Sequence, residues 1–242
     1  MIQTERCTVL LEFLASELDA VVFGVDYRLA PEHPFPLPLD DCSDALDWVI
    51  RSAAEYTVDP TRIGLLGGSA GGQLAAALAL RYSQAPAVAA KPQLRMVSLV
   101  VPVTAHPKAQ RLFEQERRVL KSDNELAFAN EPSPSEAVVE EFEKLLRMYL
   151  GDNEDVFDPF VSPLMSKPEE LLKHPRTHIT VSACDVLRDQ ALAYGQLLRS
   201  AGVQATEEVL QGVPHGFTFP TNAEVTRGWF ESQRDLFMEA FQ

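Results

Sequence analysis

Residues 62–77 decide the fold, and they read RIGLLGGSAGGQLAAA. The stretch begins with apolar residues typical of a strand and ends, from Ala70 on, as the Ala/Leu-rich start of a helix. Between the two, Gly67, Ser69 and Gly71 form the pattern G-x-S-x-G, whose glycines let the backbone crowd where a strand turns sharply into a helix. The pattern predicts a turn that holds the Ser69 hydroxyl out from a sheet, at the N-terminus of a helix.

This predicted position of Ser69 suits a nucleophile. The backbone N–H of the next residue, Ala70, can face an oxyanion, and the helix dipole favours negative charge there. A serine hydroxyl is a weak nucleophile near pH 7 until an imidazole takes its proton and a carboxylate orients that imidazole. The rest of the chain should therefore supply a histidine and an acid.

Both groups are found downstream, just after predicted strands. Asp185 follows the apolar run 179–183, and His215 lies in the loop after 205–210. Asp189 is a second candidate for the acid, but four residues further on it should already lie in a helix. Asp185 could instead be a helix N-cap, and His215 a loop histidine bonded to backbone.

Apolar runs and helical spacing alternate along the chain, which predicts an α/β fold with a mostly parallel sheet and helices on both faces. We expect one domain, 1–242, with a charged helical insertion at 106–173 that resembles a cap. The expected strands are 20–25, 62–67, 96–101, 179–183 and 205–210, and the expected helices are 5–19, 40–53, 70–82, 111–120, 135–150, 188–201 and 222–241.

Composition limits the function classes. The chain has 242 residues, 46% of them hydrophobic, and 21 Lys+Arg against 35 Asp+Glu give a net charge of −14. This charge argues against a nucleic-acid partner. We expect a protein of the cytoplasm, because no apolar run is long enough to span a bilayer and no signal peptide is evident. Three scattered cysteines and the absence of H-E-x-x-H spacing predict no disulfide framework, no metal and no cofactor.

Four blocks in the same order resemble the hormone-sensitive-lipase-like α/β-hydrolases. They are DYRLAPEHP at 26–34, GGSAGG at 67–72, CDVLRD at 184–189 and HGF at 215–217. The resemblance covers nearly the whole chain and implies a serine carboxylesterase acting on short-chain or other small-molecule esters. It implies Ser69 as nucleophile, His215 as base and then acid, and Asp185 as the residue that orients it. In DYRLAPEHP, the polar residues Asp26, Arg28 and Glu32 are better candidates for a network that holds the loop than for catalysis.

The sequence departs from that family in one respect. The family carries a His-Gly-Gly-Gly block, which supplies most of its oxyanion hole, before the helix that corresponds to 5–19, and this sequence contains no such block. We therefore expect an N-terminally truncated version of the fold and slow turnover, with Ala70 as the one recognisable oxyanion donor. The strand at 20–25 should then pair with 62–67, face a water-filled gap, or pair with a strand from another chain in a homo-oligomer.

Three functions remain open from the sequence. The complete set of Ser69, Asp185 and His215 favours a serine esterase. The missing glycine block favours a catalytically weak protein of the same fold that binds a small molecule or a partner. A lyase or dehydratase that reuses the same pocket is the third.

Overall fold

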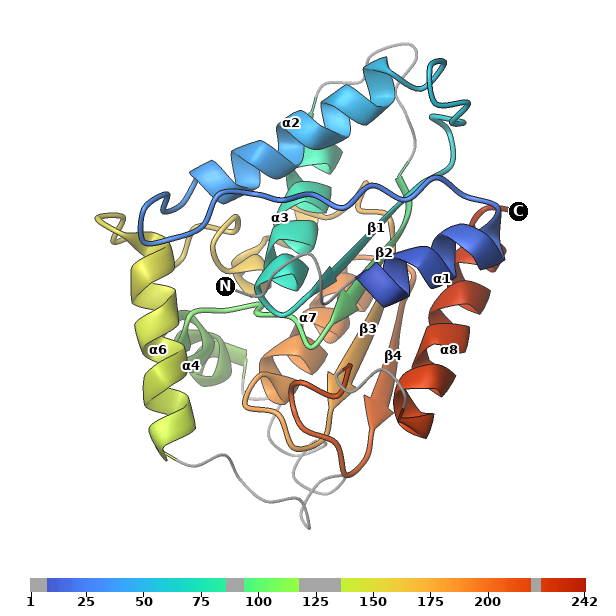
Figure 1. Cartoon of the computed structure of the whole chain (residues 1–242). Coiled ribbons are helices and arrows are strands. Elements are labelled where there is room, and N and C mark those ends of the chain that lie inside the picture. Colours follow the sequence, from blue (N-terminus) through green and yellow to red (C-terminus); the bar gives the residue numbers. More distant parts are fainter. Residues whose placement is uncertain (1–7, 86–93, 118–135, 219–222) are drawn as a thin grey trace.

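A computed structural model describes residues 8–85, 94–117, 136–218 and 223–242 (Figure 1). Its sheet has four parallel strands in the spatial order β1-β2-β3-β4, which is also their order along the chain. The strands are β1 (Ile63–Gly68), β2 (Leu94–Val100), β3 (Arg176–Ser182) and β4 (Ala205–Leu210). Since all strands run the same way, their carboxyl ends meet at one edge of the sheet.

Helices cover both faces of this sheet, as predicted. On one face α3 (Ala70–Gln84) packs on β1 and β2, and α7 (Arg188–Ser200) packs on β3 and β4. On the other face α8 (Glu224–Ala240) packs on β2 and contacts α1 (Thr8–Leu18). The helix α2 (Leu37–Arg51) lies against α3 on its outer side (Figure 1). None of the described helices combines the length and apolarity that a membrane span requires.

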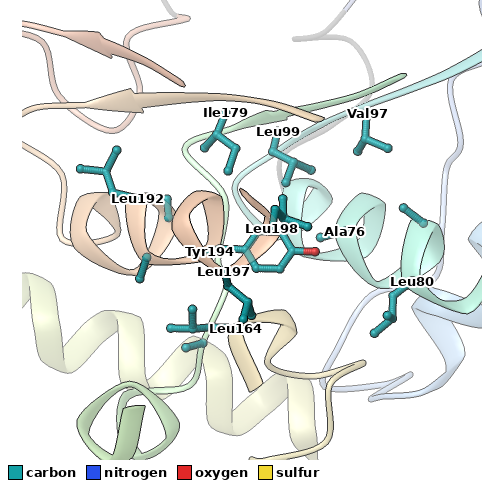
Figure 2. Close-up of a cluster of buried hydrophobic side chains, with 14 of the residues drawn as sticks. Ala76, Leu80, Val97, Leu99, Leu164, Ile179, Leu192, Tyr194, Leu197 and Leu198 are labelled. Atoms are coloured by element: carbon teal, nitrogen blue, oxygen red, sulfur yellow. The ribbon is translucent and has the colours of Figure 1, made fainter. Parts of the chain in front are cut away.

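The main core lies between the sheet and the helices α3 and α7 (Figure 2). The sequence predicted burial of α3 on most sides, and ten of its 15 residues are buried. This follows because α3 is covered by the sheet on one side and by Leu39 and Leu46 of α2 on another. The side chains that fill this core include Ala76, Leu80, Val97, Leu99, Leu164, Ile179, Leu192, Tyr194, Leu197 and Leu198.

The predicted strand at 20–25 is wrong. None of these residues joins a β ladder and none is buried, so the expected pairing with β1 is absent as well. Val21 and Val25 are exposed, whereas Val22 packs against a buried cluster that includes Leu10 of α1 and Trp229 of α8. The ring of Phe23 meets Trp48 and Tyr56 edge-on at centroid distances of 5.7 and 5.6 Å. The apolar run predicted a segment covered on both faces, and the exposure of Val21 and Val25 shows that apolar character alone does not ensure that coverage.

The segment predicted as a helical insertion, 106–173, contains helices and, at 151–162, irregular chain. It contains α4 (Pro107–Arg117) and α6 (Glu136–Leu150), followed by the short 3-10 turns η2 (Pro163–Met165) and η3 (Pro168–Glu170). The predicted helix 111–120 begins earlier than expected, and its last three residues lie outside the described part of the chain. Similarly, α2 begins at Leu37 instead of residue 40, because a proline such as Pro38 is tolerated in the first turn of a helix.

One buried histidine couples the fold to pH. His174 precedes β3, and burial lowers its pKa to about 4 because the charged imidazolium would lose its water. In the unfolded chain a histidine has a pKa of about 6.5. Between these values the unfolded state binds a proton that the folded state does not. The free energy of unfolding should therefore fall by about 3 kcal/mol as the pH falls from about 6.5 to about 4.

Urea denaturation at several pH values measures this loss. The variant His174→Gln should show a flatter dependence over the same window, because the other titrating groups are shared with the wild type. Parallel curves for the two proteins would contradict the assignment to His174.

Candidate active site

Ser69 sits between β1 and α3 in a backbone conformation that few residues adopt. Its φ and ψ are 55° and −117°, in the region with positive φ. Such a conformation costs about 1–3 kcal/mol and persists only when its surroundings enforce it. Here the N–H of Ser69 donates to Val100 O at 2.8 Å, and its carbonyl accepts from Gln73 N at 3.1 Å and Val103 N at 3.3 Å. These bonds tie the turn to the carboxyl end of β2 and to α3.

The turn needs two glycines, Gly67 and Gly72, and only Gly67 is one of the two that the sequence pattern suggested. A Cβ on Gly67 would lie 2.1 Å from the carbonyl oxygen of Gly71, and a Cβ on Gly72 would lie 2.9 Å from Pro102 Cβ. A Cβ on Gly71 would meet nothing within 4 Å. Crowding therefore explains Gly67 and Gly72, and the steric reason given for Gly71 is wrong.

The side chains of Ser69, His215 and Asp185 form a continuous line of hydrogen bonds. His215 Nε2 lies 2.9 Å from Ser69 Oγ, and His215 Nδ1 lies 2.7 Å from Asp185 Oδ2. The three residues follow β1, β4 and β3, so the sheet brings them together at its carboxyl edge although they are up to 146 positions apart. Ligand sites of open parallel sheets are commonly found at this edge.

The acid and the histidine differ in exposure. The side chain of Asp185 is 2% exposed and that of His215 is 42% exposed. The second carboxylate oxygen, Oδ1, accepts from Leu187 N at 3.0 Å, so each oxygen of Asp185 has its own donor. A further bond joins the end of β3 to the loop that carries His215, because Ser182 Oγ donates to the carbonyl of Val213. The acid is thus fixed inside the protein, while the histidine can be reached from solvent.

Asp189 does not take part in this arrangement. It lies in the first turn of α7, where its carboxylate accepts from Arg188 Nε at 2.8 Å. This agrees with its expected place inside a helix. The predicted network in the 26–34 loop is formed in part by Arg28, whose guanidinium binds Asp41 at 2.7 Å. That ion pair holds the pKa of Asp41 below its usual range.

The other described histidines lie in different surroundings. His106 is buried and accepts from Lys108 N, and burial lowers its pKa. His178 Nδ1 lies 2.8 Å from Thr206 Oγ1. Within the described residues no three His, Cys, Asp or Glu side chains come together in a way that could hold a metal ion. No disulfide joins Cys42 to Cys184, and Cys7 lies outside the described part.

Ala70 is the first residue of α3 and is exposed. The first N–H groups of a helix have no acceptor within the helix, so the N–H of Ala70 is available to a ligand beside Ser69. Its role as an oxyanion donor stays a prediction. The sequence did not single out Ser182, Val103 or Leu187, whose bonds hold the site, because no local pattern marks a residue that acts only through a distant partner.

Comparisons with known proteins agree with the geometry. A family model for the alpha/beta hydrolase fold matches residues 2–219. An AB hydrolase superfamily protein of Schizosaccharomyces pombe is 33% identical over 84% of this chain and 55% of its own length. Rabbit arylacetamide deacetylase (Oryctolagus cuniculus) is 31% identical over 91% of this chain and 67% of its own length. The sequence thus spans little more than half of the first of these relatives and about two thirds of the second.

A solved structure leads to the same fold. The carboxyl esterase 2 of the fungus Tuber melanosporum superimposes with a TM-score of 0.80 at 26% identity, over 99% of this chain and 74% of the other.

The glycine geometry gives a test of the turn. Gly72→Ala should lower the free energy of unfolding by about 1–3 kcal/mol, because the new methyl group meets Pro102 and overpacks the elbow. Gly71→Ala is the matched control in the same helix turn, and it should be neutral or slightly stabilising, since alanine is the better helix former. Urea denaturation of both variants decides the matter. If Gly72→Ala loses no more stability than Gly71→Ala, the contact with Pro102 does not destabilise the turn, and the crowding argument is wrong.

Proposed function

Because the chain belongs to the alpha/beta hydrolase family, we propose that it is a serine carboxylesterase with Ser69 as nucleophile, His215 as general base and Asp185 as the acid that orients it. The observation that supports this most strongly is the line of hydrogen bonds from Asp185 through His215 to Ser69. A serine, an imidazole and a buried carboxylate in this order are the parts that acyl transfer through a serine requires.

In the first half of the reaction, Ser69 Oγ attacks the ester carbonyl. His215 Nε2, at 2.9 Å, takes the hydroxyl proton, and Asp185 stabilises the imidazolium that forms. The C–O bond to the alcohol then breaks, and His215 gives the proton to the leaving oxygen. In the second half a water molecule attacks the acyl-enzyme, with His215 again accepting the proton, and the acid leaves as Ser69 is restored.

The negative charge of the tetrahedral intermediate needs hydrogen-bond donors. We assign the N–H of Ala70 to this role because α3 begins there and its dipole favours an anion. One donor is typically worth about 10²–10³ in turnover. With a single assigned donor, we expect hydrolysis of p-nitrophenyl acetate below the ordinary enzyme range of about 1–10³ per second.

We propose a small-molecule ester as the substrate. The support comes from the printed names of similar proteins, an arylacetamide deacetylase and a carboxyl esterase. The net charge of −14 disfavours nucleic acid as a partner. We also propose that the protein acts in the cytoplasm.

Labelling with a fluorophosphonate tests the nucleophile. The probe should modify Ser69, because its hydroxyl is bonded to His215, and Ser69→Ala should lose the label. Ser200→Ala is the matched control and should keep it, since Ser200 Oγ donates to Leu197 O on the surface of α7. Mass spectrometry of the labelled peptide gives the position. Modification of a different serine would overturn the assignment.

Hydrolysis of p-nitrophenyl acetate tests the two partners of the serine. His215→Ala should lower kcat by about 10²-fold or more, because general-base catalysis is lost. Asp185→Asn should also lower kcat, whereas Asp189→Asn should not, since Asp189 bonds Arg188 and not His215. A wild-type protein that neither labels nor hydrolyses any ester would favour the binding protein over the esterase.

A further inference from the structure

The helix α6 is anchored near its C-terminus by Tyr149. The phenolic O–H of Tyr149 donates to Gln73 Oε1 at 3.1 Å, and its backbone carbonyl accepts from Phe35 N at 2.7 Å. Burial raises the pKa of Tyr149, so the hydroxyl keeps the proton that it donates. Tyr149 therefore joins α6 to α3 through its side chain and to Phe35 through its backbone.

Gln73 receives this bond from within the helix that carries the nucleophile. Its backbone N–H donates to Ser69 O at 3.1 Å, so it lies one turn into α3. Its side chain is buried, and Nε2 donates to the carbonyl of Phe160 at 2.5 Å. A buried amide whose oxygen and nitrogen both have partners has one orientation, because turning it over would break both bonds.

The middle of α6 packs against residues that hold the nucleophile and the acid. Leu146 is buried in one cluster with Val103 and Leu187. Val103 N donates to Ser69 O, and Leu187 N donates to Asp185 Oδ1. One apolar side chain of α6 thus shares a buried cluster with the two residues whose backbone N–H groups bind Ser69 and Asp185.

We propose that Gln73 and Tyr149 are a positioning pair that fixes α6 beside the reacting serine, and that this pair thereby controls how tightly the enzyme binds esters with long acyl chains. The inference rests on the proposed esterase function. An acetyl group on Ser69 is too short to extend beyond the nucleophile and its donors. A long acyl chain must find an apolar surface nearby, and α6 offers the half-buried Phe142, which packs against the buried cluster of Leu146, Val103 and Leu187.

The experiment compares Tyr149→Phe with the wild type on p-nitrophenyl acetate and p-nitrophenyl octanoate. The variant keeps the ring and loses only the hydroxyl, so α6 loses its bond to Gln73 and little packing. We expect KM for the octanoate to rise about fivefold with kcat unchanged, the pattern of lost ground-state binding. Both constants for the acetate should stay within about twofold, because the bonds that hold Ser69 and Asp185 come from the backbone N–H groups of Val103 and Leu187 and not from α6.

The matched control is Tyr56→Phe. Tyr56 is 39% exposed and packs on Phe23 and Trp48, far along the chain from α6, so its variant should leave both substrates unchanged. Hydrogen exchange of residues 140–150 gives a readout that needs no turnover. Exchange there should be faster in Tyr149→Phe than in the wild type or in Tyr56→Phe.

The outcomes separate this inference from the proposed function. Faster exchange in 140–150 together with a KM effect confined to the octanoate supports the positioning pair. Unchanged exchange, or a fall in kcat on both substrates, overturns it even if the protein is an esterase. If the wild type hydrolyses neither substrate and its Ser69 takes no fluorophosphonate, the esterase proposal itself fails, and the positioning pair fails with it.

Discussion

The site depends on the backbone of Ser69, which is held at a φ of 55° by hydrogen bonds from both sides. A serine in this conformation is strained by itself, and the strain places its hydroxyl above the end of β1 instead of along a strand or a helix. The bond to Val100 O is possible only because β2 runs beside β1 in register, with Gly68 opposite Val100. The parallel sheet therefore supplies a bond that stabilises Ser69 in its strained conformation.

The same sheet explains how three distant residues meet. Asp185 and His215 lie in loops that follow β3 and β4, and the register of these strands places the ends of both at one level. Two bonds hold each loop to the end of the other strand, from Ser182 Oγ of β3 to Val213 O and from Ala183 N to Leu210 O of β4. Burial of the Asp185 carboxylate strengthens its interaction with the imidazole, because little water competes for it. His215, by contrast, is partly exposed and can be reached from solvent.

Local pattern was enough to predict most of this arrangement from the sequence. Four of the five predicted strands and the helices beside them are present within a few residues, because each combines a clear period with a stop signal. The preference for Asp185 over Asp189 followed from the strand ends, and Asp189, which the sequence kept as a second candidate, bonds Arg188 in the structure. The prediction failed at 20–25, where Phe23 packs on Trp48 and Tyr56 and no residue joins the sheet. It also failed for Gly71, since Pro102 crowds the glycine that follows it, and Pro102 reaches the turn only through the fold.

These successes and failures have a common physical cause. The reacting groups lie in turns at the ends of regular elements, where short-range sequence rules apply. The surroundings of those groups are set by contacts between segments far apart in the chain, such as Tyr149 with Gln73, 76 positions away. No period or motif marks such a contact, because each partner alone is an ordinary helical residue. The residues of the proposed reaction are therefore marked by local sequence, whereas the proposed role of α6 depends on how it packs against α3, and only the folded structure gives that packing.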